Sequence, residues 1–443
     1  MSTHTIVSGF SKLTRDERIQ WLARQTKDAG ELGPLLQSHF HADPILQGMY
    51  EEFSENTLSN FFLPFGLAPN FLINDRLFIV PMVIEESSVV AAASAAARFW
   101  ALNGGFHAKV IDRVKVGQVH FRWSGDGGQL KKLFQQSKKE LISSVALLTQ
   151  SMEKRGGGIK DIRFLDKTDK LSNYYQLFVT FCTADAMGAN FINTVLEGLA
   201  KSWQELVMQK RKTTDLRGDL EIIMSILSNY TPESMVECYV EAPVSALDKL
   251  DNNLNGAAFA ERFVMAVDIA RKDPYRAVTH NKGIFNGMDA VVLATGNDFR
   301  AVEACGHAYA SHDGTYKSLS EASVKKGMFR FSLKVPLAVG TVGGLTQLHP
   351  LAKKSLEILG NPGSSLLMEI VAASGLANNF SAIRSLITKG IQHGHMKMHL
   401  SNILQQLSAS EPEKDEIKRH FADKTVSHSA VEKQLDLIRH PKT

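Results

Sequence analysis

The chain has 443 residues, of which 44% are hydrophobic and 22% are charged, and its formal net charge is +4. This length exceeds what one hydrophobic core usually organises, so we expect about two or three domains. The composition is that of a globular protein, and so small a net charge leaves no footprint for nucleic-acid binding. Three well-separated cysteines, Cys182, Cys238 and Cys305, argue against a disulfide framework and for a reducing compartment.

The first 25 residues are polar and charged, and they lack the apolar core of a signal peptide. No window approaches eighteen uninterrupted apolar residues, because the longest candidate, near 79–97, contains Glu85, Glu86 and several serines. We therefore expect a cytoplasmic protein with no membrane anchor.

The first hundred residues predict short helices followed by one strand and one longer helix. Residues 11–62 read as short helices, the first of them capped by Thr14. The apolar run 77–84 predicts a brief strand, and an alanine-rich helix should follow over 89–102.

From about residue 108 strands and helices alternate. We expect an alternating strand pair at 108–123 and an amphipathic helix at 131–154. Two strands should follow at 159–166 and 174–183, and a second helix at 191–211. This order predicts a compact α/β insert of the split-βαβ type over roughly 108–222.

The remainder reads as a mixed region followed by a helical, highly charged C-terminal segment from about residue 380. The sequence GTVGG at 340–344 lies between a strand-like run, 329–339, and an apolar helix. The chain contains no GxGxxG motif, so a bound dinucleotide would not use the usual Rossmann fingerprint. Composition and periodicity therefore give no sign of redox chemistry.

The most informative stretch is AVTHNKGIFNGMDAVVLATG, residues 277–296, which places Lys282 among small, turn-forming and apolar residues. A lysine in such surroundings is costly to bury unless a nearby charge balances it. Asp298 follows Lys282 by sixteen positions, and Lys–Asp pairs in clefts are typical of sites that polarise a carbonyl group. The alternative is a surface lysine and an unrelated loop aspartate.

Three further segments accompany this one: IEESSVVAAAS at 84–94, DAMGAN at 185–190 and GIQHGHMKMH at 390–399. With these four motifs in this order, the chain resembles the 3-hydroxy-3-methylglutaryl-coenzyme A (HMG-CoA) reductases, specifically their soluble class II form found in bacteria. The resemblance extends from about Glu55 to His399.

The resemblance implies an α+β fold in which a large mixed substrate-binding domain carries an inserted small ferredoxin-like, non-Rossmann cofactor domain and a helical C-terminal flap. The large domain should begin at 1–107, with the catalytic glutamate, and continue at 223–377, with the catalytic lysine and aspartate. The small dinucleotide-binding domain should cover 108–222, and the flap with the catalytic histidine should cover 378–443. It also implies a homodimer with sites at the shared interface, and class II dimers can assemble further.

The implied reaction is the NAD(P)H-dependent four-electron reduction of HMG-CoA to mevalonate and free CoA, on the route to isoprenoids. Such chemistry needs a cation for the developing alkoxide, a proton donor at the carbonyl oxygen and an acid for the departing thiolate. One alternative is the same reaction in reverse, for mevalonate catabolism. Others are an acyl-CoA hydrolase or transferase that uses the same CoA surface, and a non-enzymatic helical scaffold.

Four residues match catalytic positions of the family. Lys282 would stabilise successive oxyanions as a compact ammonium, and Asp298 would hold and tune that lysine. Glu86, the second residue of the acidic pair, matches the proton donor, whereas Glu85 reads as an acid at a helix N-terminus. His395 matches the histidine that protonates the CoA thiolate.

Other residues match substrate contacts. Ser88 and Arg276 correspond to residues that grip the free carboxylate of the substrate, a group that an arginine fork suits geometrically. Asn286 corresponds to an asparagine that contacts the reacting group, although by itself it reads as a turn residue. Ser87 is a departure, because the family usually has proline there. Weaker candidates for lining the site are Thr279, His280 and Asn379.

His399 either contacts the CoA phosphates or lies on the surface. It also suggests a metal site, because His395 and His399 would lie one helical turn apart. On a helix, however, His393 would point well away from His395, and no nearby Glu–Cys set completes a shell. We therefore expect no bound metal.

The DAMGAN motif offers small residues that let a dinucleotide approach and a helix start that can receive a phosphate. The implied cofactor contacts are Asp185, Met187, Gly188 and Asn190. NADH-preferring relatives carry an aspartate where this chain has Thr149, seven residues before a GGG turn. A hydroxyl does not repel a 2′-phosphate, and the nearby basic residues Lys154, Arg155 and Lys160 attract one. We expect NADPH to be used at least as well as NADH.

Overall fold

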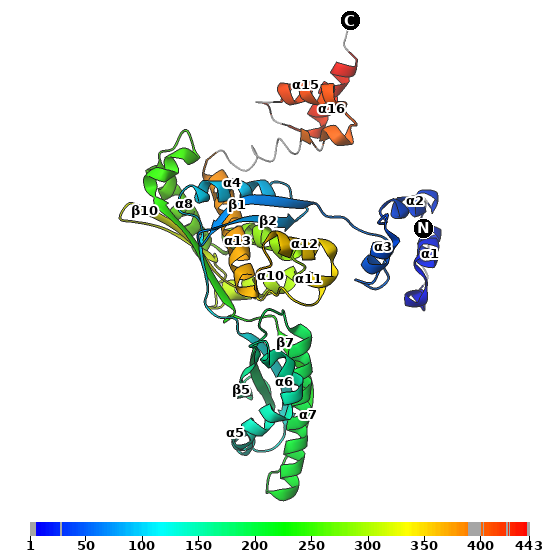
Figure 1. The fold of residues 1–443 in the computed structure, drawn as a ribbon, viewed down its shortest axis with the longest axis vertical. Coiled ribbons are helices and arrows are strands. Elements are labelled where there is room, and N and C mark those ends of the chain that lie inside the picture. Colours follow the sequence, from blue (N-terminus) through cyan, green and yellow to red (C-terminus); the bar gives the residue numbers. More distant parts are fainter. Residues whose placement is uncertain are drawn as a thin grey trace. The chain divides into compact units, whose positions relative to one another are not determined.

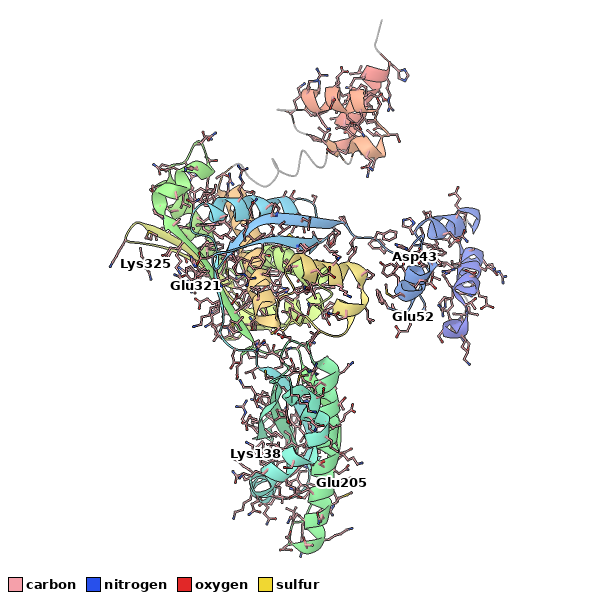
Figure 2. All side chains as sticks on the ribbon, viewed as in Figure 1. Asp43, Glu52, Lys138, Glu205, Glu321 and Lys325 are labelled. Atoms are coloured by element: carbon pink, nitrogen blue, oxygen red, sulfur yellow. The ribbon has the colours of Figure 1, made fainter. Side chains whose placement is uncertain are left out.

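The computed structural model describes residues 6–26, 29–388, 400–401, 403–421, 424 and 426–440. Its helices and strands form the mixed α+β fold that the sequence predicts (Figure 1). The chain divides into two compact units, Met1–Pro64 and Phe65–Thr443. Exposed charged side chains such as Glu205 and Lys325 belong to the surface of the second unit (Figure 2).

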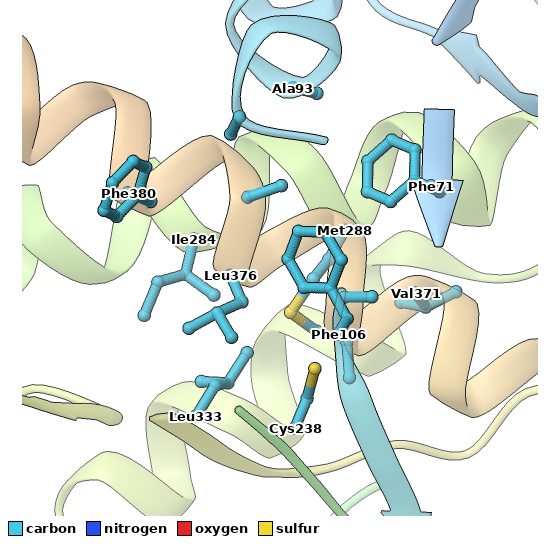
Figure 3. Packing of buried hydrophobic residues seen from close by; sticks show 14 of the residues in the cluster. Phe71, Ala93, Phe106, Cys238, Ile284, Met288, Leu333, Val371, Leu376 and Phe380 are labelled. Carbon is cyan, nitrogen blue, oxygen red and sulfur yellow. The ribbon is translucent and has the colours of Figure 1, made fainter. Parts of the chain in front are cut away.

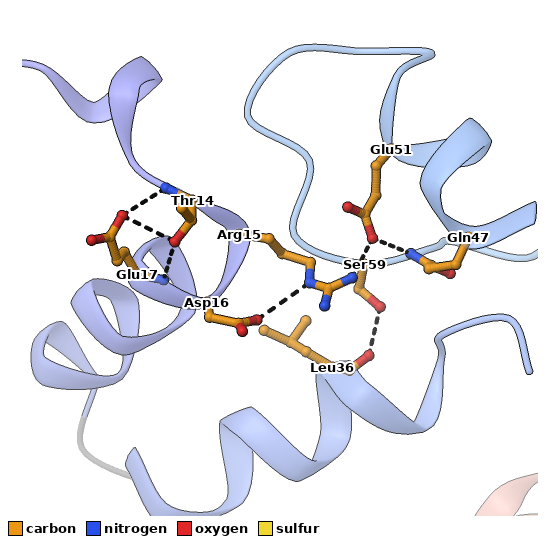
Figure 4. A network of polar contacts seen from close by, with 8 residues as sticks. All are labelled: Thr14, Arg15, Asp16, Glu17, Leu36, Gln47, Glu51 and Ser59. Carbon is orange, nitrogen blue, oxygen red and sulfur yellow. Dashed lines mark hydrogen bonds and ion pairs between the residues drawn. The ribbon is translucent and has the colours of Figure 1, made fainter. Parts of the chain in front are cut away.

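The first unit consists of short helices, as predicted. They are η1 (Phe10–Lys12), α1 (Arg15–Gln25), α2 (Ala29–Ser38) and α3 (Pro44–Glu51). Thr14 caps α1 in a reciprocal capping box with Glu17, so the predicted cap is confirmed. An ion pair between Arg15 and Glu51 joins α1 to α3, and Gln47 donates a hydrogen bond of 2.8 Å to the same carboxylate (Figure 4).

Two antiparallel sheets organise the larger part of the second unit. One pairs β1 (Phe65–Ile73) with β2 (Arg76–Val83). The other has the strand order β3-β8-β10-β9, with bounds His107–Val110, Met235–Pro243, Met328–Pro336 and Ser320–Lys325. The helices of this part are α4 (Val89–Ala101), η2 (Val244–Leu250), α8 (Gly256–Lys272), α9 (Pro274–Ala294), α10 (Phe299–Ala310), α11 (Leu345–Leu348), α12 (Pro350–Ile358) and α13 (Ser364–Ile387).

Helices α9 and α13 cross closely in the core. A Cβ atom at Gly287 of α9 would lie 2.4 Å from the carbonyl oxygen of Ser374, and one at Gly375 of α13 would lie 2.6 Å from the Met288 side chain. Glycine is therefore needed on both sides for the helices to join one apolar core (Figure 3). This packing keeps 274–294 helical despite its glycine and asparagine residues.

Helix α13 is central to this core. Among the described residues, it is the helix that is long and apolar enough to cross a membrane by length and composition. However, 78% of its most apolar window is buried within the protein, where it packs against α9, α4 and β8. Core packing thus accounts for its apolar sequence.

A third sheet has ferredoxin-like topology. Its elements are β4 (Lys115–Trp123), α5 (Gly127–Ser144), α6 (Ala146–Glu153), β5 (Gly158–Asp166), β6 (Tyr174–Cys182), α7 (Ala189–Thr213) and β7 (Leu220–Ser228). The strands lie in the order β5-β6-β4-β7, and all neighbouring pairs are antiparallel. The connectivity is that of the split βαβ motif, as predicted.

Two local expectations for this region are wrong. The expected single helix over 131–154 is two helices, because the buried Val145 leaves helical geometry between α5 and α6. The expected strand pair over 108–123 does not pair with itself, since β3 and β4 belong to different sheets. Alternation of side chains predicts a strand and its faces, but it does not identify the partner strand.

Near the C-terminus, apolar residues including Leu404, Ile417 and Val431 form a small cluster of their own. The helices there are α15 (Glu411–His420) and α16 (His428–Arg439), and Arg439 pairs with Glu413 at 2.8 Å. The helical character expected for this segment is confirmed in its described part.

Candidate active site

Lys282, Asn286 and Glu86 meet at one point of the second unit. Lys282 and Asn286 are four residues apart on α9, so their side chains leave the same face of the helix. The Lys282 ammonium pairs with Oε2 of Glu86, and the Asn286 amide donates a hydrogen bond of 3.2 Å to the same oxygen. The Lys282 side chain is 55% exposed. An ion pair this open to water contributes little to stability, and its ammonium is accessible to a reactant.

A strained turn holds Glu86. Ser88, at the N-cap position of α4, has a φ of 75° and a ψ of −15°, a left-handed conformation that residues other than glycine rarely adopt. Its side chain caps no N–H group of the helix. Such a conformation costs about 1–3 kcal/mol and persists where the surrounding structure imposes it, often at functional sites. Glu85 is exposed, and Glu86 is the member of the pair that contacts α9.

Asp298 is the N-cap residue of helix α10. Its Oδ1 accepts hydrogen bonds from the backbone N–H groups of Arg300 and Ala301, at 3.1 and 3.2 Å, and the Arg300 guanidinium pairs with it at 3.2 Å. In the part of the chain that the structure describes, Lys282 is brought together with Glu86 and not with Asp298.

Two residues considered for the substrate site are buried in a hydrogen-bonded cycle. Nε2 of His280 lies 2.6 Å from Oγ of Ser320, which donates to Oδ1 of Asn379 at 3.2 Å. The Asn379 amide in turn donates to the His280 carbonyl at 3.1 Å. Burial lowers the pKa of His280 to about 3, so the ring is neutral. The cycle joins α9 to β9 and α13.

Two further candidates lie in the first turns of α9. Arg276 is half-buried, and burial lowers its pKa. Its guanidinium forms no hydrogen bond or ion pair with any residue that the structure describes. A half-buried cation without a protein anion is able to pair with an anionic ligand. Thr279 is exposed, and its hydroxyl lies 3.5 Å from the Tyr275 carbonyl.

The DAMGAN residues form the connection from β6 to α7. Gly188 is the N-cap of α7 with a φ of 85°, and a Cβ atom there would lie 2.4 Å from Cγ2 of Thr183, so only glycine fits without a shift. Among the described residues no side chain caps the first turn of α7, which contains the exposed Asn190. The N–H groups of that turn can therefore receive an anion.

Asp185 anchors this loop. Its Oδ1 accepts a hydrogen bond of 2.8 Å from the N–H of Ser364 at the start of α13 and pairs with Arg113 at 3.6 Å. Its carbonyl accepts a hydrogen bond of 2.8 Å from the N–H of Thr341. The GTVGG segment, 340–344, is in turn held by Asn297, whose Oδ1 accepts from the N–H of Gly340 at 2.7 Å.

Thr149 is not open to a ligand in this conformation. It is 2% exposed, and its hydroxyl donates to a carbonyl of its own helix at 3.2 Å. The basic residues over 154–160 are exposed. A Cβ atom at Gly157 would lie 2.5 Å from the carbonyl of Cys182, so this basic turn touches the end of the strand that leads into DAMGAN.

The predicted catalytic His395 lies outside the described residues, as do His393 and His399. Sequence reasoning also missed residues that hold the candidate site together. They share polar side chains that bond to backbone groups of distant segments: Arg113, Lys115, Asn281, Asn297 and Asn378. Their signal is tertiary, because each of them bonds to a segment that is distant in the sequence.

Comparisons with known proteins point to one family. The model of the family described as "Hydroxymethylglutaryl-coenzyme A reductase" matches residues 14–400. The 3-hydroxy-3-methylglutaryl-coenzyme A reductase of Archaeoglobus fulgidus is 36% identical over 418 residues, which cover 93% of this chain and 89% of that protein. The probable reductase of Borreliella burgdorferi is 29% identical over 415 residues, covering 93% and 92%.

Solved structures agree. A class II 3-hydroxy-3-methylglutaryl-CoA reductase from Streptococcus pneumoniae, bound to NADPH in open conformations, has a TM-score of 0.70 and 35% identity, covering 86% of this chain and 100% of that one. Another structure of the reductase from the same organism has a TM-score of 0.71 and 34% identity, covering 98% and 100%.

Proposed function

The chain belongs to the hydroxymethylglutaryl-coenzyme A reductase family, whose members reduce HMG-CoA to mevalonate, and we propose that Lys282 and Glu86 carry that reaction here. The observation that supports this most directly is the convergence of Lys282 and Asn286 on one oxygen of Glu86. Reduction of a thioester requires a cation and a proton donor at the same carbonyl oxygen. This trio supplies both.

Each residue has a distinct task in this proposal. NADPH, when bound, supplies the hydride. Lys282 stabilises the negative charge that develops on the carbonyl oxygen, Glu86 delivers a proton to that oxygen, and Asn286 fixes the orientation of the carboxyl group. The tuning of Lys282 by Asp298 stays a prediction, because Asp298 pairs with Arg300 among the described residues. His395 protonates the departing CoA thiolate.

Arg276 and Ser88 are proposed to hold the free carboxylate of the substrate. The support is the Arg276 guanidinium, which has no anionic partner among the described residues. Thr279 and His399 remain proposed substrate contacts. His280 and Asn379 would not contact the substrate themselves. They would hold α9 in place through the buried hydrogen-bonded cycle with Ser320.

The DAMGAN loop fits a dinucleotide phosphate. Gly188 leaves no room for a side chain beside Thr183, and the first turn of α7 has no side-chain cap. Met187, Gly188 and Asn190 would lie along the cofactor, while Asp185 would secure the loop through Ser364. The basic turn over 154–160 offers charge for a 2′-phosphate.

Comparing kcat/KM for NADPH and NADH tests the cofactor assignment. We expect NADPH to be used at least as well as NADH, since Thr149 carries no charge that would repel the 2′-phosphate. A tenfold preference for NADH, about 1.4 kcal/mol, would show that another residue controls the pocket.

The proposal extends to the location, the oligomeric state and the domain bounds of the protein. The chain would act as a cytoplasmic homodimer without nucleic-acid or membrane partners. Its large domain would comprise 1–107 and 223–377, the cofactor domain 108–222 and the flap 378–443.

One assay separates the proposed activity from its alternatives. Purified protein is mixed with HMG-CoA and NADPH while nicotinamide absorbance and free thiol are followed together. The proposed reaction consumes two NADPH for each thiol released. Thiol release without NADPH oxidation would identify a hydrolase, and no change in either signal would leave a non-enzymatic protein.

A further inference from the structure

Lys115 is a buried lysine whose side chain binds backbone carbonyls of the DAMGAN loop. It begins β4, is 6% exposed, and donates from Nζ to the carbonyls of Ala186 and Met187 at 2.9 and 2.7 Å. Lysine is almost never buried this deeply without a carboxylate partner. No ion pair to Lys115 exists among the described residues, and the carboxylate of Asp185 is instead paired with Arg113.

Uncharged groups also hold the DAMGAN loop in place. The hydroxyl of Thr183 donates to the Ala186 carbonyl at 2.7 Å, so this oxygen accepts from both Thr183 and Lys115. Gly340 packs so closely that a Cβ atom would lie 2.3 Å from the Met187 nitrogen. The loop therefore has little freedom to turn its peptide groups while Lys115 is in place.

The orientation of one peptide group follows from planarity. In a trans peptide the C=O and the N–H point in opposite directions. Because the Met187 carbonyl points to Lys115, the N–H of Gly188 in the same peptide group points away from Lys115. Gly188 is the N-cap of α7, so this N–H joins the uncapped N–H groups of the first helical turn.

We propose that Lys115 is a positioning residue for the dinucleotide: its ammonium holds the peptide groups of Ala186 and Met187 so that Gly188 and the first turn of α7 present their N–H groups to the pyrophosphate. This inference rests on the proposed function, which assigns the dinucleotide to that loop. Lys115 itself does not touch the cofactor, because its side chain is buried behind the two carbonyls that it binds.

The charge of Lys115 couples cofactor binding to protons. Burial lowers its pKa to about 7, and the positive charge of Arg113 adds to this lowering, while the Cys182 thiol opposes it. At pH 8 part of the free protein therefore carries a neutral Lys115. A pyrophosphate at the loop favours the ammonium form, so binding at pH 8 takes up a proton.

The test compares Lys115→Met with Lys132→Met, which removes an exposed lysine from α5 of the same sheet domain. Dissociation constants for NADPH and for HMG-CoA are measured by titration calorimetry at pH 6.5. We expect Lys115→Met to weaken NADPH binding about tenfold, since two carbonyls lose a charged donor. HMG-CoA binding should be unchanged, and Lys132→Met should match wild type for both ligands.

Proton uptake provides a second measurement, and its main result is obtained with the wild-type protein. Calorimetry at pH 8 in buffers of different ionisation enthalpy should detect protons taken up when wild type binds NADPH. Thr183→Val, which removes only the neutral bond to Ala186, should retain that uptake, and Lys115→Met should lose it.

The outcomes separate this inference from the proposed function. Wild type that binds no NADPH would overturn the proposed function. Wild type that binds NADPH without proton uptake would overturn the proton coupling, and Lys115→Met that binds NADPH with unchanged affinity would overturn the role of Lys115. Equal loss of NADPH and HMG-CoA binding in Lys115→Met would also overturn that role, because it would indicate general support of the fold.

Discussion

Asn286 donates a hydrogen bond of 3.2 Å to Oε2 of Glu86, a residue 200 positions earlier in the chain. The Lys282 ammonium contacts the same oxygen from the preceding turn of α9. Two donors on one helix face thus fix a carboxyl group that a strained turn presents at the start of α4. The arrangement fixes the carboxyl group that we propose as proton donor beside the Lys282 ammonium.

Lys282→Ala should abolish most turnover while leaving HMG-CoA binding largely intact, because the oxyanion loses its cation. Removing such a stabiliser typically lowers kcat by about 10²–10³-fold. Steady-state kinetics and calorimetric binding of HMG-CoA check this expectation. Lys334→Ala, which removes an exposed lysine of β10, is the control and should behave as wild type. Turnover near the wild-type rate in Lys282→Ala would remove the central assignment.

His395→Gln should stop reduction of the thioester but spare reduction of free mevaldehyde. Only the thioester releases a thiolate that needs a proton, so only that substrate depends on the acid. Rates with HMG-CoA and with mevaldehyde are compared in one preparation. An equal loss on both substrates would contradict the role assigned to His395.

Gly188→Ala should raise KM for NADPH by about tenfold or more, because the loop must move to relieve both the backbone strain and the contact with Thr183. Gly327→Ala is a matched control, since Gly327 also has a positive φ, of 76°, but no atom within 4 Å of a Cβ position. It should change stability without changing KM. Thr183→Ala added to Gly188→Ala should recover part of the loss; no recovery would contradict the steric cause.

His280 should make the folded state less stable in acid. Burial holds its pKa at about 3, below the ordinary 6.5. The unfolded chain therefore binds a proton below pH 6.5 that the folded protein excludes until about pH 3, and the free energy of unfolding falls across that window. The loss is about 2 kcal/mol at pH 5. Denaturant unfolding of wild type and His280→Gln at pH 7 and pH 5 measures it, and an equal pH dependence in both proteins would refute it.

Asp289→Asn should stabilise the protein at pH 8. Burial, with the neighbouring Glu303 carboxylate, holds the pKa of Asp289 well above its usual range. Since the unfolded chain ionises at ordinary aspartate pKa, folded-state stability falls as pH rises towards the raised value. Asparagine mimics the protonated form and escapes this loss. Thermal unfolding at pH 5 and pH 8 should show a clearly larger gain for Asp289→Asn at the higher pH; a gain of equal size at both would contradict the titration.

Much of the local structure could be read from the sequence. Thr14 followed by Glu17 is a capping signal that works within one helical turn, and the structure has that cap. The aromatic and β-branched run over 174–183 predicts β6, a strand whose residues are mostly buried. The order of the four motifs was sufficient to predict the family.

The helix around Lys282 shows where local reasoning ends. Its glycine and asparagine residues favour turns, yet 274–294 is one helix, because Gly287 and Gly375 let α9 and α13 pack closely. The same limit explains why β3 and β4 were expected to pair and instead belong to different sheets.

By itself the sequence determined which residue types are available for thioester reduction and roughly which elements carry them. Only the tertiary structure decided which of them meet: Lys282 contacts Glu86 while Asp298 pairs with Arg300, His280 and Asn379 turn inward, and Lys115 lies under the DAMGAN loop. The physical reason is that caps and periodicity act over a few residues. Ion pairs and buried hydrogen bonds form between segments that only the packing of helices and sheets brings together.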